Sequence, residues 1–271
     1  MTRFLVVPQW QGSPAARAMH LIDGAEAIAG DLPRGATVRV DVPIEAGEAL
    51  DTGIRRFSAL SRVREAVADA LAADADHPAI VIGGDCAVAV PAIAHAASRH
   101  ENLVVVWFDA HADLNSPETS PSGAFAGMAL RAVFTEFALP GTGAVPAERV
   151  ILAGAREFDD GERDTITSHA LTVIGADDLA DPAGLADAVA TTGATALYLH
   201  VDLDVLDPAA IAGVGLPVPF GLSLDELIGA IKAVRARVPL VGASIAGFAP
   251  ASATAAVDDL GTILRVVGAL A

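Results

Sequence analysis

Short runs of apolar, mostly β-branched residues recur along this chain, and segments with helical periodicity separate most of them. The candidate strands are residues 3–7, 38–42, 79–82, 103–108, 149–154, 171–174, 194–201 and 239–245. The candidate helices are residues 56–73, 87–99, 178–191, 223–237 and 257–269. Because strands that alternate with helices form parallel sheets covered on both faces, the pattern predicts an α/β fold.

Length and composition fit one domain of this class. A chain of 271 residues is an ordinary size for one α/β domain, and no linker-like change in composition divides it. Hydrophobic residues make up 53% of the chain and aromatic residues only 4%, so Ala, Val, Leu and Ile dominate, as in strands buried on both faces. We expect a single domain over residues 1–271.

The formal charge of the chain limits its partners. The net charge is −17, whereas nucleic acids and anionic membranes bind basic surfaces, so we expect neither as a partner. No apolar stretch is long enough to span a bilayer, and the N-terminal apolar run is too short for a signal peptide. The single cysteine cannot form an internal disulfide, which favours a cytoplasmic location. We expect a small-molecule substrate.

Acidic residues and histidines follow two of the candidate strands. The sequence "WFDAHADLN" ends the fourth strand, and "YLHVDLDVLDP" ends the seventh. At two-residue spacing, these stretches contain Asp109, His111 and Asp113 in the first and His200, Asp202 and Asp204 in the second. An extended backbone would place each set on one face, at the sheet edge where α/β proteins bind ligands. These are the candidate functional residues.

The residue types in the two clusters predict a metal site. Buried carboxylates that gather at strand ends repel one another and are costly to desolvate unless a cation neutralises them. Carboxylates with an imidazole suit Mn²⁺ best, with Fe²⁺, Co²⁺ or Zn²⁺ as weaker alternatives. Capping of strand ends is the other interpretation, but two clusters with the same period favour metal binding. The predicted ligands are Asp109, His111, Asp113, Asp202 and Asp204.

The motifs "GGDC", "DAHAD" and "DLDVLDP", in this order, resemble the metal motifs of the ureohydrolase family, which includes arginase and agmatinase. The resemblance implies a three-layer α/β/α arginase-like fold with an eight-stranded, mainly parallel sheet. It also implies two Mn²⁺ ions with a hydroxide that attacks a guanidine carbon. The ions would share Asp109 and Asp202, the inner ion adding His111 and Asp204, and the outer ion Asp113 and a histidine. In this chain Cys86 replaces that histidine.

The resemblance also implies residues that bind the amino-acid end of a substrate. The matching positions are Asn115, Ser120, Ser122, Asp159 and Glu162. Hydroxyls and an amide suit a carboxylate, and the two acids suit an ammonium group. Agmatine has no carboxylate, so these residues favour a substrate with an intact L-amino-acid end. Ordinary loop polarity is the alternative for any one of them.

The other end of the implied substrate site departs from the family pattern. Ala126 stands where family arginases carry a proton-shuttling histidine, and Gly247 where they carry a glutamate that contacts the guanidinium. Either the chain is a non-catalytic metal-binding paralogue, or it hydrolyses a less basic guanidine. The retained amino-acid clamp favours hydrolysis of Nω-hydroxy-L-arginine to hydroxyurea and L-ornithine, as in the family branch of D-cycloserine biosynthesis. A conventional arginase, or a hydrolase of another guanidino acid, is the alternative.

Cys86 bears on metal content and mechanism. Its side chain is shorter than histidine, and thiolate is a soft ligand, so we expect one firmly bound Mn²⁺ and a weak or empty second site. Asp113 is expected to orient the attacking water or take its proton. A rival mechanism makes Cys86 the nucleophile with His200 as its base, although orienting a metal ligand is the favoured role for His200. The sequence specifies no oligomeric state; family members are often trimers or hexamers, which allows a homo-oligomer.

Overall fold

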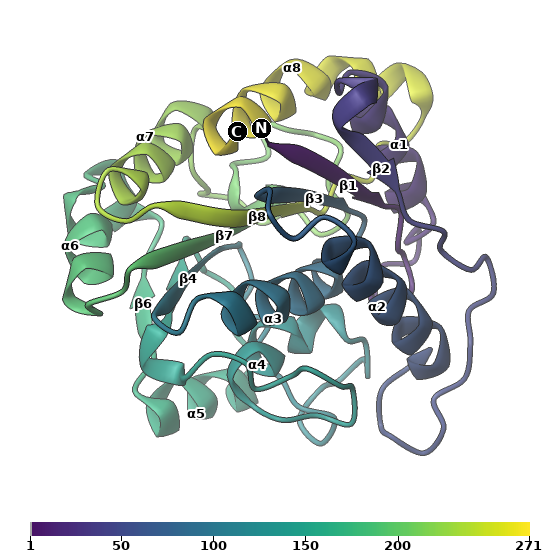
Figure 1. Cartoon of the computed structure of the whole chain (residues 1–271), viewed down its shortest axis with the longest axis horizontal. Helices are drawn as coiled ribbons and strands as arrows, with labels where there is room; N and C mark the ends of the chain where they lie inside the picture. The colour runs from purple at the N-terminus through teal and green to yellow at the C-terminus, as the bar shows by residue number, and fades with distance from the viewer. Residues whose placement is uncertain (1) are drawn as a thin grey trace.

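The computed structural model describes residues 2–271, and its centre is one eight-stranded parallel sheet (Figure 1). The strand order is β2-β1-β3-β8-β7-β4-β5-β6, and every neighbouring pair is parallel. The strands are β1 (Arg3–Val7), β2 (Thr37–Arg39), β3 (Ala79–Gly83), β4 (Leu103–Phe108), β5 (Val150–Ala153), β6 (Thr172–Ile174), β7 (Ala196–Asp202) and β8 (Leu240–Ala246). The predicted α/β class and the eight-stranded sheet are confirmed.

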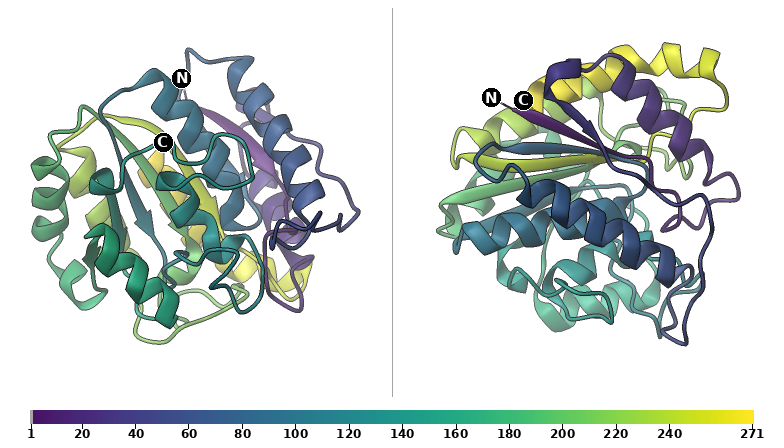
Figure 2. Two further views of the ribbon diagram at one scale, coloured as in Figure 1. Left: turned by 90° about the horizontal axis from the view of Figure 1, so that it is seen from below. Right: turned by 45° about the vertical axis from the view of Figure 1, so that its right-hand side comes forward.

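Helices cover both faces of the sheet, which gives the predicted three layers (Figures 1 and 2). One face packs against α2 (Phe57–Ala72), α3 (Ala89–Arg99), α4 (Ala129–Phe134) and α5 (Asp160–His169). The other packs against α1 (His20–Gly30), α6 (Ala183–Thr191), α7 (Leu224–Arg235) and α8 (Ala253–Leu270). Alternate residues of each central strand enter the two cores, as Trp107 and Phe108 do in β4.

Three helices are absent from the sequence-based expectation. Helix α5, "DGERDTITSH", contains one strongly apolar residue, Ile166, so it has no apolar stripe to detect. Helix α4 has only six residues, and α1 is a short Ala- and Gly-containing segment. β2 is also shorter than predicted, ending at Arg39, and residues 178–180 form a 3₁₀ turn before α6. These differences lie outside the central strands.

The two ends of the described chain lie side by side, where the Thr2 hydroxyl donates to the carbonyl of Ala271 (Figure 2). No helix in residues 2–271 is long and apolar enough to cross a membrane. The carboxyl ends of β3, β8, β7, β4 and β5 are consecutive along one edge of the sheet. Segments that are far apart in sequence therefore meet at this edge.

Candidate metal centre and substrate cleft

A cavity of about 670 Å³ opens at the carboxyl edge of the central strands. Its lining includes every predicted site residue except His200: Cys86, Asp109, His111, Asp113, Asn115, Ser120, Ser122, Asp159, Glu162, Asp202 and Asp204. His200 lies behind the cavity wall and is fully buried. The structure thus gathers five separate segments of the chain into one cleft.

The first acidic cluster is held by turns rather than by the strand that precedes it. β4 ends at Phe108, and the Asp109 carboxylate accepts a hydrogen bond from the backbone N–H of His111 at 2.8 Å. Its other oxygen accepts from the indole N–H of Trp107 at 3.1 Å. Asp113 has a φ of +54°, a left-handed conformation that an extended strand does not contain. The expected strand-like alternation is therefore wrong, although the three side chains still line one cavity.

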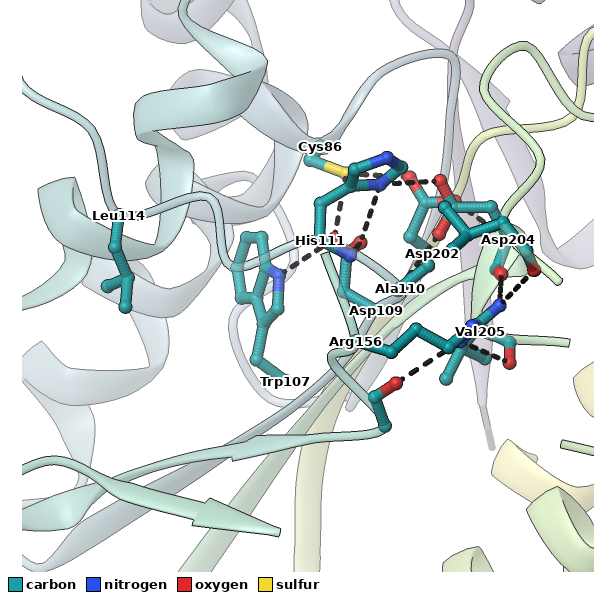
Figure 3. A network of polar contacts seen from close by, with 12 residues as sticks. Cys86, Trp107, Asp109, Ala110, His111, Leu114, Arg156, Asp202, Asp204 and Val205 are labelled. Atoms are coloured by element: carbon teal, nitrogen blue, oxygen red, sulfur yellow. Dashed lines mark hydrogen bonds and ion pairs between the residues drawn. The ribbon is translucent and has the colours of Figure 1, made fainter. Parts of the chain in front are cut away.

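The second cluster repeats the local turn of the first. Asp202 ends β7, and its carboxylate accepts from the backbone N–H of Asp204 at 2.9 Å. Both clusters thus contain an aspartate that bonds the backbone two residues ahead. Asp204 in turn accepts from the backbone N–H of Ala110 at 3.1 Å, which ties the clusters together (Figure 3). The two motifs share one position because β4 and β7 are neighbours in the sheet, and this bond fixes the turns that follow them.

His111 joins the clusters through its side chain. Its Nδ1 atom lies 3.0 Å from the Asp204 carboxylate and 3.5 Å from that of Asp109 (Figure 3). Burial alone would lower the pKa of His111, but its hydrogen bonds to these two carboxylates raise that pKa to about 12. Without a metal ion, His111 is therefore the cation of the cluster.

The carboxyl groups are too crowded to be fully ionised without a cation. Burial, followed by carboxylate repulsion, raises the pKa of Asp202 to about 7 and that of Asp204 to about 6. The same causes raise the pKa of Asp109, and they raise that of Asp113 well above its ordinary value. One oxygen of Asp113 is buried and has no hydrogen-bond partner within residues 2–271.

Ligand-type atoms converge in the same place. One atom each from Asp109, His111 and Asp204 lies within 4.8 Å of the others. Carboxylates that need a counter-charge, an imidazole and an unpartnered carboxylate oxygen together form a donor set that suits a divalent metal ion. The residues therefore fit the metal chemistry that the motifs predict.

Cys86 lies where β3 gives way to a 3₁₀ turn, Cys86–Val88. Its sulfur is 2.8 Å from one oxygen of Asp202 and 3.9 Å from one of Asp109. Burial, and then the nearby carboxylates, raise the pKa of this thiol well above its ordinary value. The protonated thiol therefore donates a hydrogen bond to Asp202, and no thiolate is available in this arrangement.

His200 is packed as a neutral side chain. Its ring centroid lies 3.7 Å from that of Trp107, and its Nδ1 atom is 2.7 Å from the Ser244 hydroxyl. Burial lowers the pKa of His200 to about 3. Its Nε2 atom has no hydrogen-bond partner among the described residues. One of its ring nitrogens lies within 4.8 Å of ligand-type atoms of Cys86 and Asp109. Its burial keeps it from direct contact with a molecule in the cleft.

The predicted amino-acid clamp also serves as a helix cap. The Asp159 carboxylate accepts from the Asn115 amide at 2.8 Å, and Asp159 is the N-cap of α5. Glu162 accepts from the backbone N–H groups of Leu114 at 3.0 Å and Asp159 at 2.8 Å. Glu162 thereby joins the two loops of the cleft, so its two oxygens already have structural partners.

The two clamp serines sit side by side on the first long loop. Their hydroxyl oxygens are 3.5 Å apart. Ser120 accepts from the backbone N–H of Gly123 and Ser122 from that of Ala124, which fixes both side chains at the cleft. One of the two hydroxyls can donate to the other, which leaves the hydrogen of the second available for a ligand.

Arg156 is a structural residue of the site that sequence reasoning missed. Its guanidinium donates to the carbonyls of Asp204 and Val205 below the metal cluster (Figure 3). It also donates to carbonyls of the second long loop. The six acceptors are the carbonyls of Gly154, Asp204, Val205, Leu206, Val218 and Pro219. A lone arginine in "GAREF" carries no motif that would have revealed this role.

Asp85 is a second structural residue that the sequence did not indicate, and it supports the turn that carries Cys86. Its buried carboxylate accepts hydrogen bonds from the Gln9 amide and the backbone N–H groups of Gly12 and Ala87. Burial raises the pKa of Asp85 to about 6. Its place in the "GGDC" motif is the sequence feature that could have indicated this role.

Known proteins with the same pattern are arginases and their relatives. The arginase family model matches residues 24–264. Arginase of Bacillus caldovelox is 34% identical over 204 residues, which cover 69% of this chain and 68% of that protein. Arginase of Staphylococcus aureus MSSA476 is 30% identical over 229 residues, 79% of this chain and 76% of that protein.

Solved structures agree on the fold. Entamoeba histolytica arginase in complex with L-ornithine has a TM-score of 0.85 at 23% identity and covers 99% of this chain and 97% of its own. Proclavaminate amidinohydrolase of Streptomyces clavuligerus has a TM-score of 0.72 at 22% identity, covering 99% of this chain and 90% of its own. With a family model that spans most of the chain, this protein belongs to the arginase family, whose members hydrolyse C–N bonds of amidines and guanidines.

Proposed function

We propose that this protein hydrolyses Nω-hydroxy-L-arginine to hydroxyurea and L-ornithine. The observation that carries the proposal is Gly247, which stands where the family pattern has an acid that contacts the guanidinium. Its φ is +89°, and a Cβ atom placed there would lie 2.1 Å from Asp202 Oδ1. No acidic side chain fits at this position, so the cleft lacks that anionic partner for a cationic guanidinium.

The chemistry of the substrate matches this loss. An unmodified guanidinium has a pKa of about 12.5 or more and stays charged, whereas an N-hydroxyguanidine is much less basic. A neutral guanidine needs no acid clamp, and it depends less on a proton donor at the position of Ala126. The reacting end thus favours Nω-hydroxy-L-arginine over L-arginine, as in the family branch of D-cycloserine biosynthesis.

The opposite end of the cleft supports an L-amino acid. Asn115, Ser120 and Ser122 would donate hydrogen bonds to the substrate carboxylate, and Asp159 and Glu162 would accept from its ammonium group. All five line the same cavity as the metal cluster. The loops that follow β4 and β5 would therefore hold the amino-acid end of the substrate.

Asp109, His111, Asp202 and Asp204 would hold one Mn²⁺ ion, which when bound lowers the pKa of water and polarises the guanidine. Asp113, whose buried oxygen has no partner in the described part of the chain, would accept the proton of the attacking water. Cys86, held as a neutral thiol, is a poor ligand for Mn²⁺, so the second metal site would be weak or empty. The protonated thiol also counts against the covalent route.

One assay separates this proposal from its alternatives. Purified protein with added Mn²⁺ is incubated with Nω-hydroxy-L-arginine, L-arginine and agmatine, and ornithine, urea and hydroxyurea are measured. We expect hydroxyurea from the first substrate and at least about tenfold slower turnover of L-arginine. Equal or faster urea release would identify a conventional arginase, and no release from any substrate would favour a non-catalytic paralogue. Metal analysis that finds two tightly bound Mn²⁺ per chain would contradict the one-metal proposal.

A further inference from the structure

A row of three side chains crosses the middle of the sheet directly behind the metal cluster. Trp107 of β4 pairs in register with His200 of β7, and His200 pairs in register with Ser244 of β8. Register partners in a parallel sheet project from the same face, so the three side chains lie next to one another in one core layer. All three are fully buried, at 0% exposure. Trp107 and His200 each stand two residues before a predicted metal ligand.

The packing of the sheet does not require the polar pair in this row. The register partners at its two ends are apolar, Leu152 of β5 beside Trp107 and Val81 of β3 beside Ser244. His200 Nδ1 lies 2.7 Å from the Ser244 hydroxyl. A buried hydrogen-bonded pair gains little stability over two apolar side chains of the same shape. The pair is therefore better explained by what it holds in place than by the stability of the sheet.

The imidazole of His200 lies against the indole of Trp107. The ring centroids are 3.7 Å apart, and the angle between the ring planes is 34°. Aromatic pairs commonly have centroids about 4.5–7 Å apart, so this contact is close, and it is nearer to face-to-face than to edge-on. The bond to Ser244 fixes the rotation of the imidazole. One face of the indole therefore packs against a ring that cannot turn freely.

The indole in turn holds one oxygen of the Asp109 carboxylate. Its N–H donates to Oδ2 of Asp109 at 3.1 Å (Figure 3). The backbone N–H of His111 donates to the other oxygen at 2.8 Å. Donors on both oxygens fix the plane of the carboxylate and leave lone pairs for an ion. Hydrogen bonds that orient a metal ligand in this way commonly contribute about 10–100-fold to metal affinity.

We propose that His200 and Ser244 are positioning residues for the metal ligand Asp109. They act through Trp107, because Ser244 fixes the imidazole, the imidazole fixes the indole, and the indole N–H orients the carboxylate. The inference rests on the metal site of the proposed function, and it gives both residues a role in Mn²⁺ affinity. It differs from direct metal ligation by His200, one ring nitrogen of which lies within 4.8 Å of ligand-type atoms of Cys86 and Asp109.

The test measures the Mn²⁺ dissociation constant of chelator-treated protein by titration calorimetry, and the melting temperature of the same metal-free protein. Trp107→Phe keeps an aromatic ring but removes the donor, so it should weaken Mn²⁺ binding by about 10–100-fold. Ser244→Ala and His200→Leu should also weaken binding, by at most the same factor. When His200→Leu is added to Trp107→Phe, the constant should change by less than about twofold, because the route to Asp109 is already interrupted.

Leu199→Val is the matched control for damage to the sheet. Leu199 is adjacent to His200 on β7 and equally buried, but it faces the opposite core. The lost methylene group should lower the melting temperature of the metal-free protein. The Mn²⁺ dissociation constant should stay at the wild-type value. Equal weakening of Mn²⁺ binding in this variant would show that general loss of stability, not positioning, explains the effect of His200→Leu.

The outcomes separate this inference from the proposed function. A wild type that binds no Mn²⁺ would overturn the metal site itself. If the wild type binds Mn²⁺ and both Ser244→Ala and His200→Leu bind it equally tightly, the positioning role is wrong and the metal site stands. Further weakening by His200→Leu in the Trp107→Phe protein would show a route that bypasses the indole, such as direct ligation. Should His200→Leu fold poorly, Ser244→Ala, which removes one oxygen atom, gives the same comparison.

Discussion

Gly247→Ala should destabilise this protein and impair its metal centre, although the change adds one methyl group. Gly247 has a φ of +89°, where residues with a side chain are strained by about 1–3 kcal/mol. The added Cβ would also lie 2.1 Å from Oδ1 of Asp202. That oxygen accepts from the backbone of Asp204, and the other accepts from Cys86, so the carboxylate cannot move away without losing hydrogen bonds.

The backbone strain alone should lower the melting temperature, Tm, by a measurable amount. At about 2–4 °C per kcal/mol for a chain of this size, Tm should fall by about 2–12 °C. Displacement of Asp202 should also lower Mn²⁺ content and kcat. Gly247→Glu should lower Tm, Mn²⁺ content and kcat by at least as much. Placing the glutamate of family arginases at this position should therefore not create an arginase.

Thermal unfolding and metal analysis of the purified variants measure both effects. Gly229→Ala is the matched control, because Gly229 lies inside α7 and a Cβ atom there would meet, among the described residues, no atom within 4 Å beyond the backbone of its own helix. It should gain about 0.5–1 kcal/mol of stability from the better helix former. If Gly247→Ala kept wild-type Tm, Mn²⁺ content and kcat, the argument from positive φ and steric conflict would be refuted.

Three further predictions concern the charged and sulfur-bearing groups. Asp85→Asn should lower the free energy of unfolding, measured with denaturant, by about 1–3 kcal/mol. All three partners of Asp85 are hydrogen-bond donors, and the amide of asparagine would turn its own N–H group toward one of them. An unchanged free energy of unfolding would contradict this role of Asp85. Cys86→Ser should retain hydroxyurea release because the thiol is protonated and is not the nucleophile. Loss of all activity in the serine variant would instead support the covalent route. Cys86→His should raise the amount of tightly bound Mn²⁺ from about one to about two ions per chain. The pKa values of Asp202 and Asp204 are about 7 and about 6, above the ordinary value of 3.8. Protonation of these two groups therefore stabilises the metal-free folded protein fully below about pH 4, and this stabilisation is lost as pH rises through about 7. Mn²⁺ competes with those protons, so the Tm gain on adding Mn²⁺ should be small at about pH 5 and full at about pH 8; a gain independent of pH would show that the carboxyls bind metal without losing protons.

The central strands were predictable because they are buried on both faces. The runs that became β3 and β4 are continuously apolar, as is β7 up to His200, and such runs between helical segments indicate parallel strands. Helix α5 was not predictable from periodicity, since its stability comes from the cap formed by Asp159 and Glu162. Those two residues were interpreted from the family resemblance as substrate ligands, and the same pair is also a capping box.

The metal cluster was predictable in composition but not in geometry. Two-residue spacing indicated Asp109, His111 and Asp113 as a group, yet a turn and a left-handed residue bring them together. That β4 and β7 are neighbours is a property of the sheet order, which spacing along the chain does not encode.

Arg156 has a consequence for the order in which this protein matures. Its guanidinium is a permanent positive charge beneath the acidic cluster, bonded to the carbonyls of the turn that carries Asp204. Together with the protons held by the crowded carboxyls, this charge balances much of the cluster before any ion arrives. We therefore expect the metal-free chain to fold with these carboxyl groups already held in place.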